Sequence, residues 1–249
     1  MYRKAIVSRA ARYWSSWTCS AVAVAALTGC GATWQPKFVD HGVGKDEYWT
    51  VQAHGKPKAV VVFLHGLAPS SGEQLEPWQA HLADEGYDVI YPRYEDPPPD
   101  LQARNNIVGA VGRALGDLGR PKVPLVILGH SRGGRLAVEA AAFLKPKLVL
   151  AYYPGQINVQ IEPPTNFRLI PPTTEIYLFV GDKDTSVGDS GAVEMAERLL
   201  TFDVPVTQIH AQTIRSRGFT ANHASMYDLS PAAKKALWGR ADALIEKSL

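Results

Sequence analysis

Ser131 lies in a pattern that could make it a nucleophile. The sequence GHSRG at 129–133 follows an apolar run at 123–128 and precedes a segment with helical spacing at 132–144. A sharp strand-to-helix turn needs small residues where strand and helix nearly touch, and the two glycines meet that need. Such a turn exposes the serine hydroxyl at the carboxyl edge of a sheet, close to the positive end of the helix dipole. The pattern therefore predicts an exposed, reactive Ser131.

A serine hydroxyl is a poor nucleophile at neutral pH, so Ser131 needs a base within hydrogen-bond reach and an acid that orients the base. The sequence GDKD at 181–184 follows an apolar run at 175–180, and His223 follows another run at 206–214. Both segments come after Ser131 in the chain. His223 is therefore the candidate base, and Asp182 and Asp184 are the candidate acids.

The elements that would position these residues alternate along the chain between strands and helices. This alternation predicts an α/β fold with a doubly wound, mostly parallel sheet flanked by helices. In such sheets ligands bind beyond the carboxyl ends of the strands, which is where the candidate residues fall. We expect strands at 48–53, 59–64, 87–94, 123–128, 147–153, 175–180 and 206–214, and helices at 73–85, 101–118, 132–144, 192–200 and 231–249.

Four motifs together resemble the α/β-hydrolase superfamily: FLHGLAPSSG at 63–72, GHSRGG at 129–134, GDKDTSV at 181–187 and NHASM at 222–226. The similarity spans nearly all of the chain after about residue 48. It implies the α/β-hydrolase fold, with Ser131 as the nucleophile and His223 as the general base and then acid. It also favours Asp184 over Asp182, because the family places its acid two or three residues beyond the strand end.

The resemblance implies an oxyanion hole made of two backbone amides. One is the amide after the nucleophile, that of Arg132. The other should come from the loop after His65, with Leu67 as the candidate and Ala68 as the alternative one residue later.

Other side chains near these motifs are candidates for binding the substrate. His65 is expected to shape the oxyanion loop and to approach the substrate, and Tyr153 and Phe219 could form apolar walls, although aromatic residues at strand ends often belong to the core. The Arg132 side chain could bind a substrate carboxylate, but an ion pair with Asp184 or Glu139 is the preferred interpretation.

Only residues 155–174, which are rich in proline, separate the strands predicted at 147–153 and 175–180. We therefore expect no large cap domain and an open site. The sequence contains no pair of cysteines with metal-ligand spacing and no HExxH motif, so we expect neither a metal nor a cofactor.

The first thirty residues resemble a bacterial lipoprotein signal. Positive charges precede a short apolar run at 21–27, which is too short to span a bilayer, and the run ends in LTGC at 27–30. We expect a signal peptide at 1–29, lipidation of Cys30, a tether at 30–46 and a catalytic domain at 47–249. An ordinary signal peptide cut near Ala32, or an uncleaved anchor, is the alternative.

This interpretation makes the protein an exported, lipid-anchored protein of the bacterial cell envelope. Loss of the leader changes the formal net charge from +2 to −2, so nucleic-acid binding is not expected, and we expect a monomer. The charges that would be lost are those of Arg3, Lys4, Arg9 and Arg12.

The function expected from the sequence is that of a serine hydrolase that cleaves a small carboxylic ester through an acyl-enzyme. Thioesterase, lipase, dienelactone-hydrolase-like and peptidase activities remain open, because they use the same residues. A binding lipoprotein that keeps the fold without catalysis is an alternative from another class.

Overall fold

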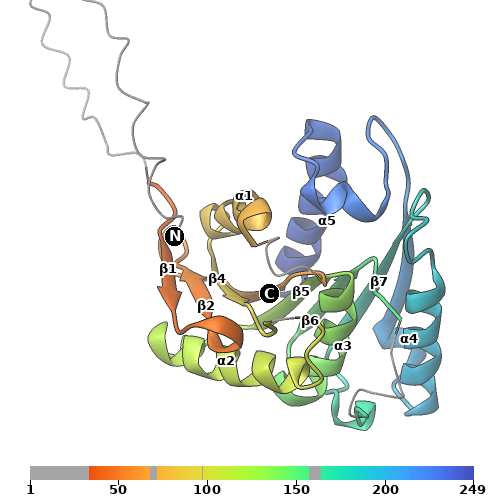
Figure 1. Ribbon diagram of the computed structural model, residues 1–249, viewed down its shortest axis with the longest axis horizontal. Helices are drawn as coiled ribbons and strands as arrows, with labels where there is room; N and C mark the ends of the chain where they lie inside the picture. Colours follow the sequence, from red (N-terminus) through yellow and green to blue (C-terminus); the bar gives the residue numbers. More distant parts are fainter. Residues whose placement is uncertain (1–33, 68–71, 97, 157–163) are drawn as a thin grey trace, which may run out of the picture. The chain divides into compact units, whose positions relative to one another are not determined.

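The computed structural model describes residues 34–67, 72–96, 98–156 and 164–249. Within these ranges one eight-stranded sheet lies between α-helices (Figure 1). The strands are β1 (Phe38–His41), β2 (Tyr48–Val51), β3 (Ala59–Leu64), β4 (Tyr87–Pro92), β5 (Leu125–His130), β6 (Leu148–Tyr152), β7 (Glu175–Gly181) and β8 (Ile209–Ile214). The α-helices are α1 (Gly72–Asp84), α2 (Ala103–Asp117), α3 (Arg132–Leu144), α4 (Ser190–Thr201) and α5 (Pro231–Ser248). Short 3-10 helices are η1 (Gly44–Asp46), η3 (Phe167–Leu169), η4 (Val206–Gln208) and η5 (His223–Tyr227).

The strand order is β1-β2-β4-β3-β5-β6-β7-β8. The pairs β1/β2 and β2/β4 are antiparallel, whereas every other neighbouring pair from β4 to β8 is parallel. The predicted α/β fold with a mostly parallel sheet is therefore confirmed. Parallel strands covered on both faces need continuous apolar runs, and all six residues of β3 are buried.

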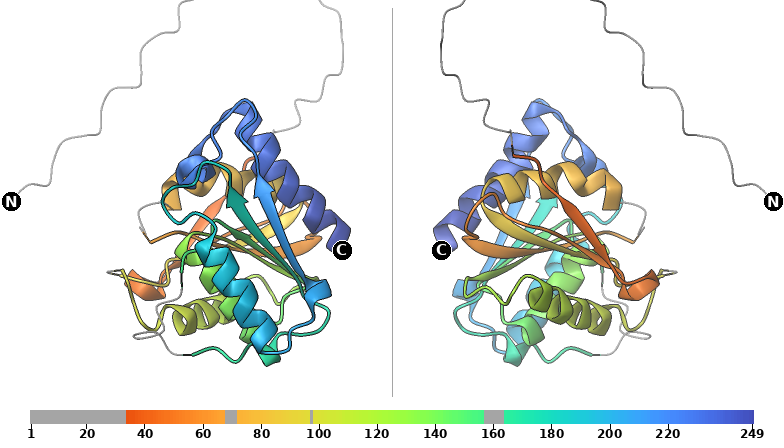
Figure 2. Two further views of the ribbon diagram at one scale, coloured as in Figure 1. Left: turned by 90° about the vertical axis from the view of Figure 1, so that its right-hand side faces the viewer. Right: turned by 90° about the vertical axis from the view of Figure 1, so that its left-hand side faces the viewer.

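Helices cover both faces of the sheet (Figure 2). Side chains alternate between the faces along each strand, so Val60 and Val62 of β3 belong to one core, with residues of α2, α3 and α4. Val61 and Phe63 belong to the other core, with residues of α1 and α5. In that second core the indole of Trp78 from α1 stacks on an indole of α5 with 5.6 Å between ring centroids.

The largest differences from the expectation concern β1 and β8. The segment at 30–46 was expected to be a tether, but β1 lies within it and pairs with β2, with Phe38 opposite Val51. The strand is only four residues long and half of it is exposed, so it carries no apolar alternation that sequence analysis could detect. The strand predicted at 206–214 begins instead with η4, and β8 covers only its second part.

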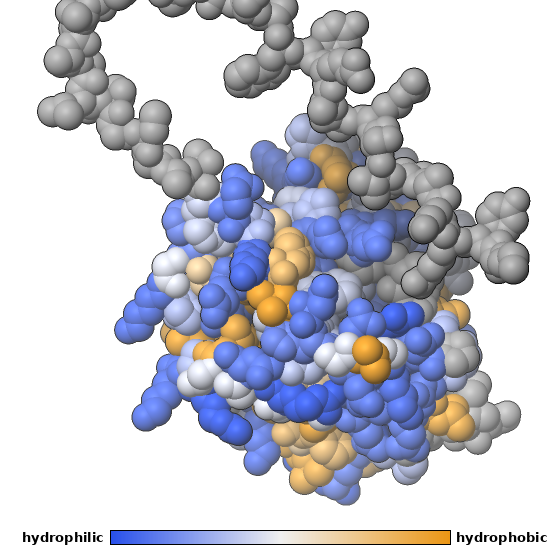
Figure 3. All heavy atoms as spheres, turned by 60° about the vertical axis from the view of Figure 1, so that its left-hand side comes forward, coloured by the Kyte–Doolittle hydropathy of each residue, from blue (hydrophilic) through white to orange (hydrophobic). Residues whose placement is uncertain are grey.

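The face shown in Figure 3 is mainly hydrophilic, with apolar side chains in small separate groups. Large exposed apolar residues among those described include Val43, Leu67 and Leu101. Within the described ranges, no helix combines the length and apolar character needed to cross a membrane. The predicted signal peptide and Cys30 lie outside the described residues.

Candidate active site

The turn between β5 and α3 forces Ser131 into an unusual backbone conformation. Ser131 has φ 55° and ψ −121°, a region that residues with side chains rarely adopt, and such strain costs on the order of 1–3 kcal/mol. A Cβ atom on Gly129 would overlap the carbonyl oxygen of Gly133, and one on Gly133 would overlap the carbonyl oxygen of His65. The spacing of the two glycines is therefore a steric requirement of this turn.

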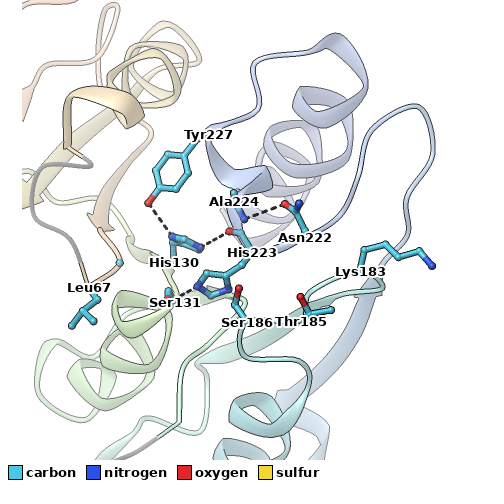
Figure 4. A pocket seen from close by; sticks show the side chains of 11 residues that line it. Leu67, His130, Ser131, Lys183, Thr185, Ser186, Asn222, His223, Ala224 and Tyr227 are labelled. Atoms are coloured by element: carbon cyan, nitrogen blue, oxygen red, sulfur yellow. Dashed lines mark hydrogen bonds between the residues drawn. The ribbon is translucent and has the colours of Figure 1, made fainter.

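Three side chains from separate elements form a chain of hydrogen bonds, of which Figure 4 shows the part between Ser131 and His223. The Ser131 hydroxyl oxygen lies 2.8 Å from Nε2 of His223, which begins η5. Nδ1 of His223 lies 2.9 Å from Oδ2 of Asp184, in the loop between β7 and α4. With Nδ1 protonated, His223 donates to Asp184 and accepts the proton of Ser131 at Nε2. This arrangement fits a nucleophile, its base and an orienting acid.

Asp184 is buried and held in its ionised form. Its Oδ1 accepts hydrogen bonds from the amides of Ser186, at 2.8 Å, and Val187, at 3.2 Å. Burial raises the pKa of Asp184, but the hydrogen bonds from His223 and from the two amides outweigh it, so the pKa lies below its ordinary value. The carboxylate can therefore stabilise positive charge on His223.

Asp182, the alternative acid, lies elsewhere. Its exposed carboxylate accepts hydrogen bonds from the hydroxyl and the amide of Ser216, at 2.6 and 3.0 Å. Those hydrogen bonds lower the pKa of Asp182. Asp182 thus fastens the loop that follows β8, and Asp184 is the aspartate that the structure brings to His223.

A cavity of about 410 Å³ opens onto Ser131 and His223. Leu67, half exposed, lies on one side of the cavity, and Arg132 is the first residue of α3, where amides point out of the helix N-terminus. Ala68, the alternative to Leu67, lies outside the described residues. The cavity is lined by Gly66, Leu67, His130, Ser131, Lys183, Thr185, Ser186, Asn222, His223, Ala224 and Tyr227.

His130, the residue before Ser131, makes a contact with a distant part of the chain. Its Nε2 lies 2.9 Å from the backbone carbonyl of His223, and the Tyr227 hydroxyl lies 3.4 Å from its Nδ1. Burial lowers the pKa of His130 to about 3, so the ring is neutral, with its proton on Nε2. His130 therefore holds the backbone of His223. The two residues are far apart in sequence, and no local pattern signals the contact.

Three expected substrate contacts are not at the cavity. His65 is fully buried, with Nδ1 and Nε2 within 2.6 Å of the carbonyl oxygens of Gly66 and Arg93, and burial lowers its pKa to about 4. Tyr153 is also fully buried, and its hydroxyl hydrogen-bonds to a serine of η5 at 2.8 Å. Phe219 lines a different cavity. The structure therefore assigns His65 and Tyr153 to the core beneath the site and places Phe219 outside it.

The Arg132 side chain forms an ion pair with an acid that was not among the expected partners. Its Nε lies 3.0 Å from Oε2 of the fully buried Glu95, and its guanidinium also donates to the carbonyl of Asp100 at 2.9 Å. Glu139, one of the expected partners, forms an ion pair with Arg135 at 3.1 Å. Burial raises the pKa of Glu95, although the Asp100 amide and Arg132 oppose that shift. Arg132 thus anchors the segment after β4 to the start of α3.

The sequence of residues 61–245 matches the model of the alpha/beta hydrolase family. The chain belongs to this family. No curated protein matches the chain. Within the described ranges, no group of three or more histidine, cysteine, aspartate or glutamate side chains could hold a metal ion.

Solved structures with different activities share the fold. A putative dienelactone hydrolase from Klebsiella pneumoniae is 17% identical, with a TM-score of 0.61, over 85% of this chain and 99% of that one. Carboxyl esterase 2 from Tuber melanosporum is 14% identical, with a TM-score of 0.62, over 90% and 89% of the two chains. An acylaminoacyl peptidase from Pyrococcus horikoshii is 13% identical, with a TM-score of 0.60, over 86% of this chain but only 42% of that one.

Proposed function

We propose that this alpha/beta hydrolase cleaves carboxylic esters through a covalent acyl-enzyme on Ser131. The observation that carries the proposal is the series of hydrogen bonds that joins Ser131, His223 and Asp184. Ser131 and His223 line an open cavity. A neutral serine becomes an effective nucleophile only when a base takes its proton, and here the base lies at hydrogen-bond distance and is itself oriented.

In the first half of the reaction, the Ser131 oxygen attacks the ester carbonyl while its proton moves to Nε2 of His223. Asp184 stabilises the imidazolium that results. The amides of Leu67 and Arg132 are proposed to hold the negative oxygen of the tetrahedral intermediate, and each such donor typically contributes about a hundredfold or more in rate. His223 then gives its proton to the departing alkoxide, which leaves as the alcohol.

In the second half, a water molecule attacks the acyl-enzyme carbonyl while His223 takes one of its protons. The intermediate collapses, His223 returns the proton to the Ser131 oxygen, and the acid is released. Each half therefore moves one proton through the same nitrogen, and the enzyme ends in its starting state.

The character of the cavity favours a small ester. Polar residues supply much of its lining on the His223 side, including Lys183, Thr185 and Asn222. A long acyl chain would place part of its apolar surface against these polar side chains, and burial of apolar surface against apolar surface is what stabilises such a chain. Short acyl groups are thus the proposed substrates, and thioesters, lipids and peptides are the alternatives that the assay must compare.

Hydrolysis of p-nitrophenyl acetate and p-nitrophenyl palmitate tests this proposal, with an acyl thioester and a peptide anilide alongside. We expect the acetate to give the highest kcat/KM, and Ser131→Ala to lower it by roughly a thousandfold or more. Equal turnover by wild type and Ser131→Ala would contradict the mechanism. A higher kcat/KM for the palmitate, the thioester or the anilide would instead indicate a lipase, a thioesterase or a peptidase.

We also propose that the protein is exported and carries a lipid on Cys30, as the LTGC sequence at 27–30 suggests. Metabolic labelling with palmitate in a bacterial host should mark the wild-type chain and a Cys19→Ala control, but not Cys30→Ala. Labelling that persists in Cys30→Ala would refute the proposed anchor.

A further inference from the structure

A second cavity, of about 570 Å³, lies at the edge of the sheet formed by β8. The end of β8, the loop at 215–219 and the first turns of α5 contribute to it, and Figures 1 and 2 show these segments at the same end of the molecule. None of its lining residues lines the cavity at Ser131. They are Thr213, Ile214, Arg215, Arg217, Phe219, Ala232, Lys235, Ala236 and Arg240.

Four of these lining residues carry a positive charge: Arg215, Arg217, Lys235 and Arg240. In the part of the chain that the structure describes, no carboxylate lies within ion-pair distance of any of them. The carboxylate of Asp182, which accepts hydrogen bonds from Ser216, interacts with Arg215 only at longer range. Four cations around one hollow repel each other, and an anion bound among them would relieve that repulsion.

Arg240 is held in place rather than free in solvent. Its Nη1 donates to Oε1 of Gln212 at 2.7 Å, and its guanidinium lies 5.6 Å from the centre of the Phe179 ring. A guanidinium positioned by neutral partners keeps its full charge and has further N–H groups for a ligand. The cavity therefore has one fixed cation beside three exposed ones.

The other lining residues are mostly apolar. Phe219 is half-buried, Ile214 is buried, and Ala232 and Ala236 present small side chains from α5. Apolar walls with a few charged groups are typical of sites for small molecules that have both an apolar part and a charged part. The lining therefore suits a ligand with an apolar part, which would lie against the aromatic ring, and an anionic part, which would lie against the cations.

We propose that this cavity binds a small amphipathic anion, a carboxylate or phosphate joined to an apolar chain. Arg215, Arg217 and Lys235 contact the anionic head, and Phe219 and Ala236 contact the apolar part. The proposal does not depend on the function proposed for Ser131, because it uses none of the residues of that site.

Binding of hexyl phosphate and of hexanoate to the full-length protein, measured by calorimetry, tests the proposal. We expect at least one of them to bind wild type more tightly than inorganic phosphate or hexanol, each of which offers only half of the ligand. The comparison of the two anions identifies the head group. Absence of binding by both would overturn the proposal.

The double variant Arg215→Gln/Arg217→Gln should bind the preferred anion roughly tenfold or more weakly, since two charge-assisted contacts are removed. Arg120→Gln/Lys122→Gln is the matched control: it removes the same charge from exposed positions before β5 and should bind like wild type. Lys235→Gln provides a second variant on another element, with a smaller loss expected. Unchanged affinity in both cavity variants would overturn the proposal.

Discussion

At the scale of single residues, two aspartates that lie two positions apart in sequence have different environments. Asp184 accepts a hydrogen bond from His223, whereas Asp182 accepts its hydrogen bonds from Ser216. We expect Asp184→Asn to lower kcat for p-nitrophenyl acetate by about 10⁴-fold, the loss typical of the same change in serine hydrolases with a Ser-His-Asp triad, because the amide favours the wrong histidine tautomer. Asp182→Asn is the matched control and should keep kcat within a few-fold. A larger loss of kcat in Asp182→Asn than in Asp184→Asn would show that Asp182 is the acid.

His130 makes stability depend on pH. Its pKa is about 3 in the folded protein and about 6.5 in the unfolded chain, so between these values the unfolded state binds more protons. The contribution of His130 to stability is complete above pH 6.5 and is lost as the pH falls, by up to about 1.4 kcal/mol per pH unit. Urea unfolding at several pH values between 7 and 5 measures how the free energy of unfolding depends on pH. That dependence should be weaker in His130→Gln, whose amide can still donate to the His223 carbonyl.

Tyr227→Phe is the control for that measurement, because it removes the hydroxyl near Nδ1 but keeps the titrating ring. The free energy of unfolding of Tyr227→Phe should depend on pH as it does in wild type. If the free energy of unfolding of His130→Gln depended on pH as strongly as that of wild type, His130 would not be held neutral by its surroundings.

At the scale of elements, the turn from β5 to α3 depends on glycine for steric reasons. A methyl group on Gly133 would overlap the carbonyl oxygen of His65, so Gly133→Ala should lower the free energy of unfolding by several kcal/mol, or displace Ser131. Gly112→Ala, in the middle of α2, meets nothing within 4 Å and should stabilise the protein by about 0.5–1 kcal/mol. Urea unfolding of both variants measures the difference. Equal effects of the two substitutions would contradict the close approach of β3 and α3.

The elements predicted best are those with the clearest hydrophobic pattern: a strand buried on both faces and a helix that packs on the sheet. The ranges of β3 and α3 agree with the prediction residue by residue, because a continuous apolar run and a strong helical period leave few alternatives. β1 was missed because a short, half-exposed edge strand owes its existence to its partner β2 rather than to its own pattern. Tertiary pairing of this kind is invisible in a single sequence.

At the scale of the whole molecule, residues 34–249 form one compact unit. Trp34 and Phe38 pack against the core on the side of α1 and α5, and the Trp34 ring stacks on His54 at 4.7 Å. A chain that begins at 34 should therefore keep its stability, whereas one that begins at 47 should lose about 2 kcal/mol or more. Thermal or urea unfolding of the two chains checks this. Equal stability would support the original assignment of 30–46 to a tether.

The sequence could predict which residues gather at the carboxyl edge of the sheet, because the alternation of strands and helices implies parallel strands, whose carboxyl ends share one edge. It could not predict contacts between side chains from distant segments. Arg132 pairs with Glu95, which sequence analysis never considered, and Phe219 faces a second cavity rather than the first. Such contacts depend on how loops pack after the sheet has formed, and loops carry no periodic pattern.

Reaction with a fluorophosphonate probe tests the central claim most directly, because the probe forms a covalent bond with a serine only when that serine is activated as a nucleophile. Wild-type protein should be labelled at Ser131, with one probe per chain, and Ser131→Ala should not be labelled. A wild-type protein that stays unlabelled, or a Ser131→Ala variant that is labelled as fast as wild type, would contradict the assignment of Ser131 as the nucleophile.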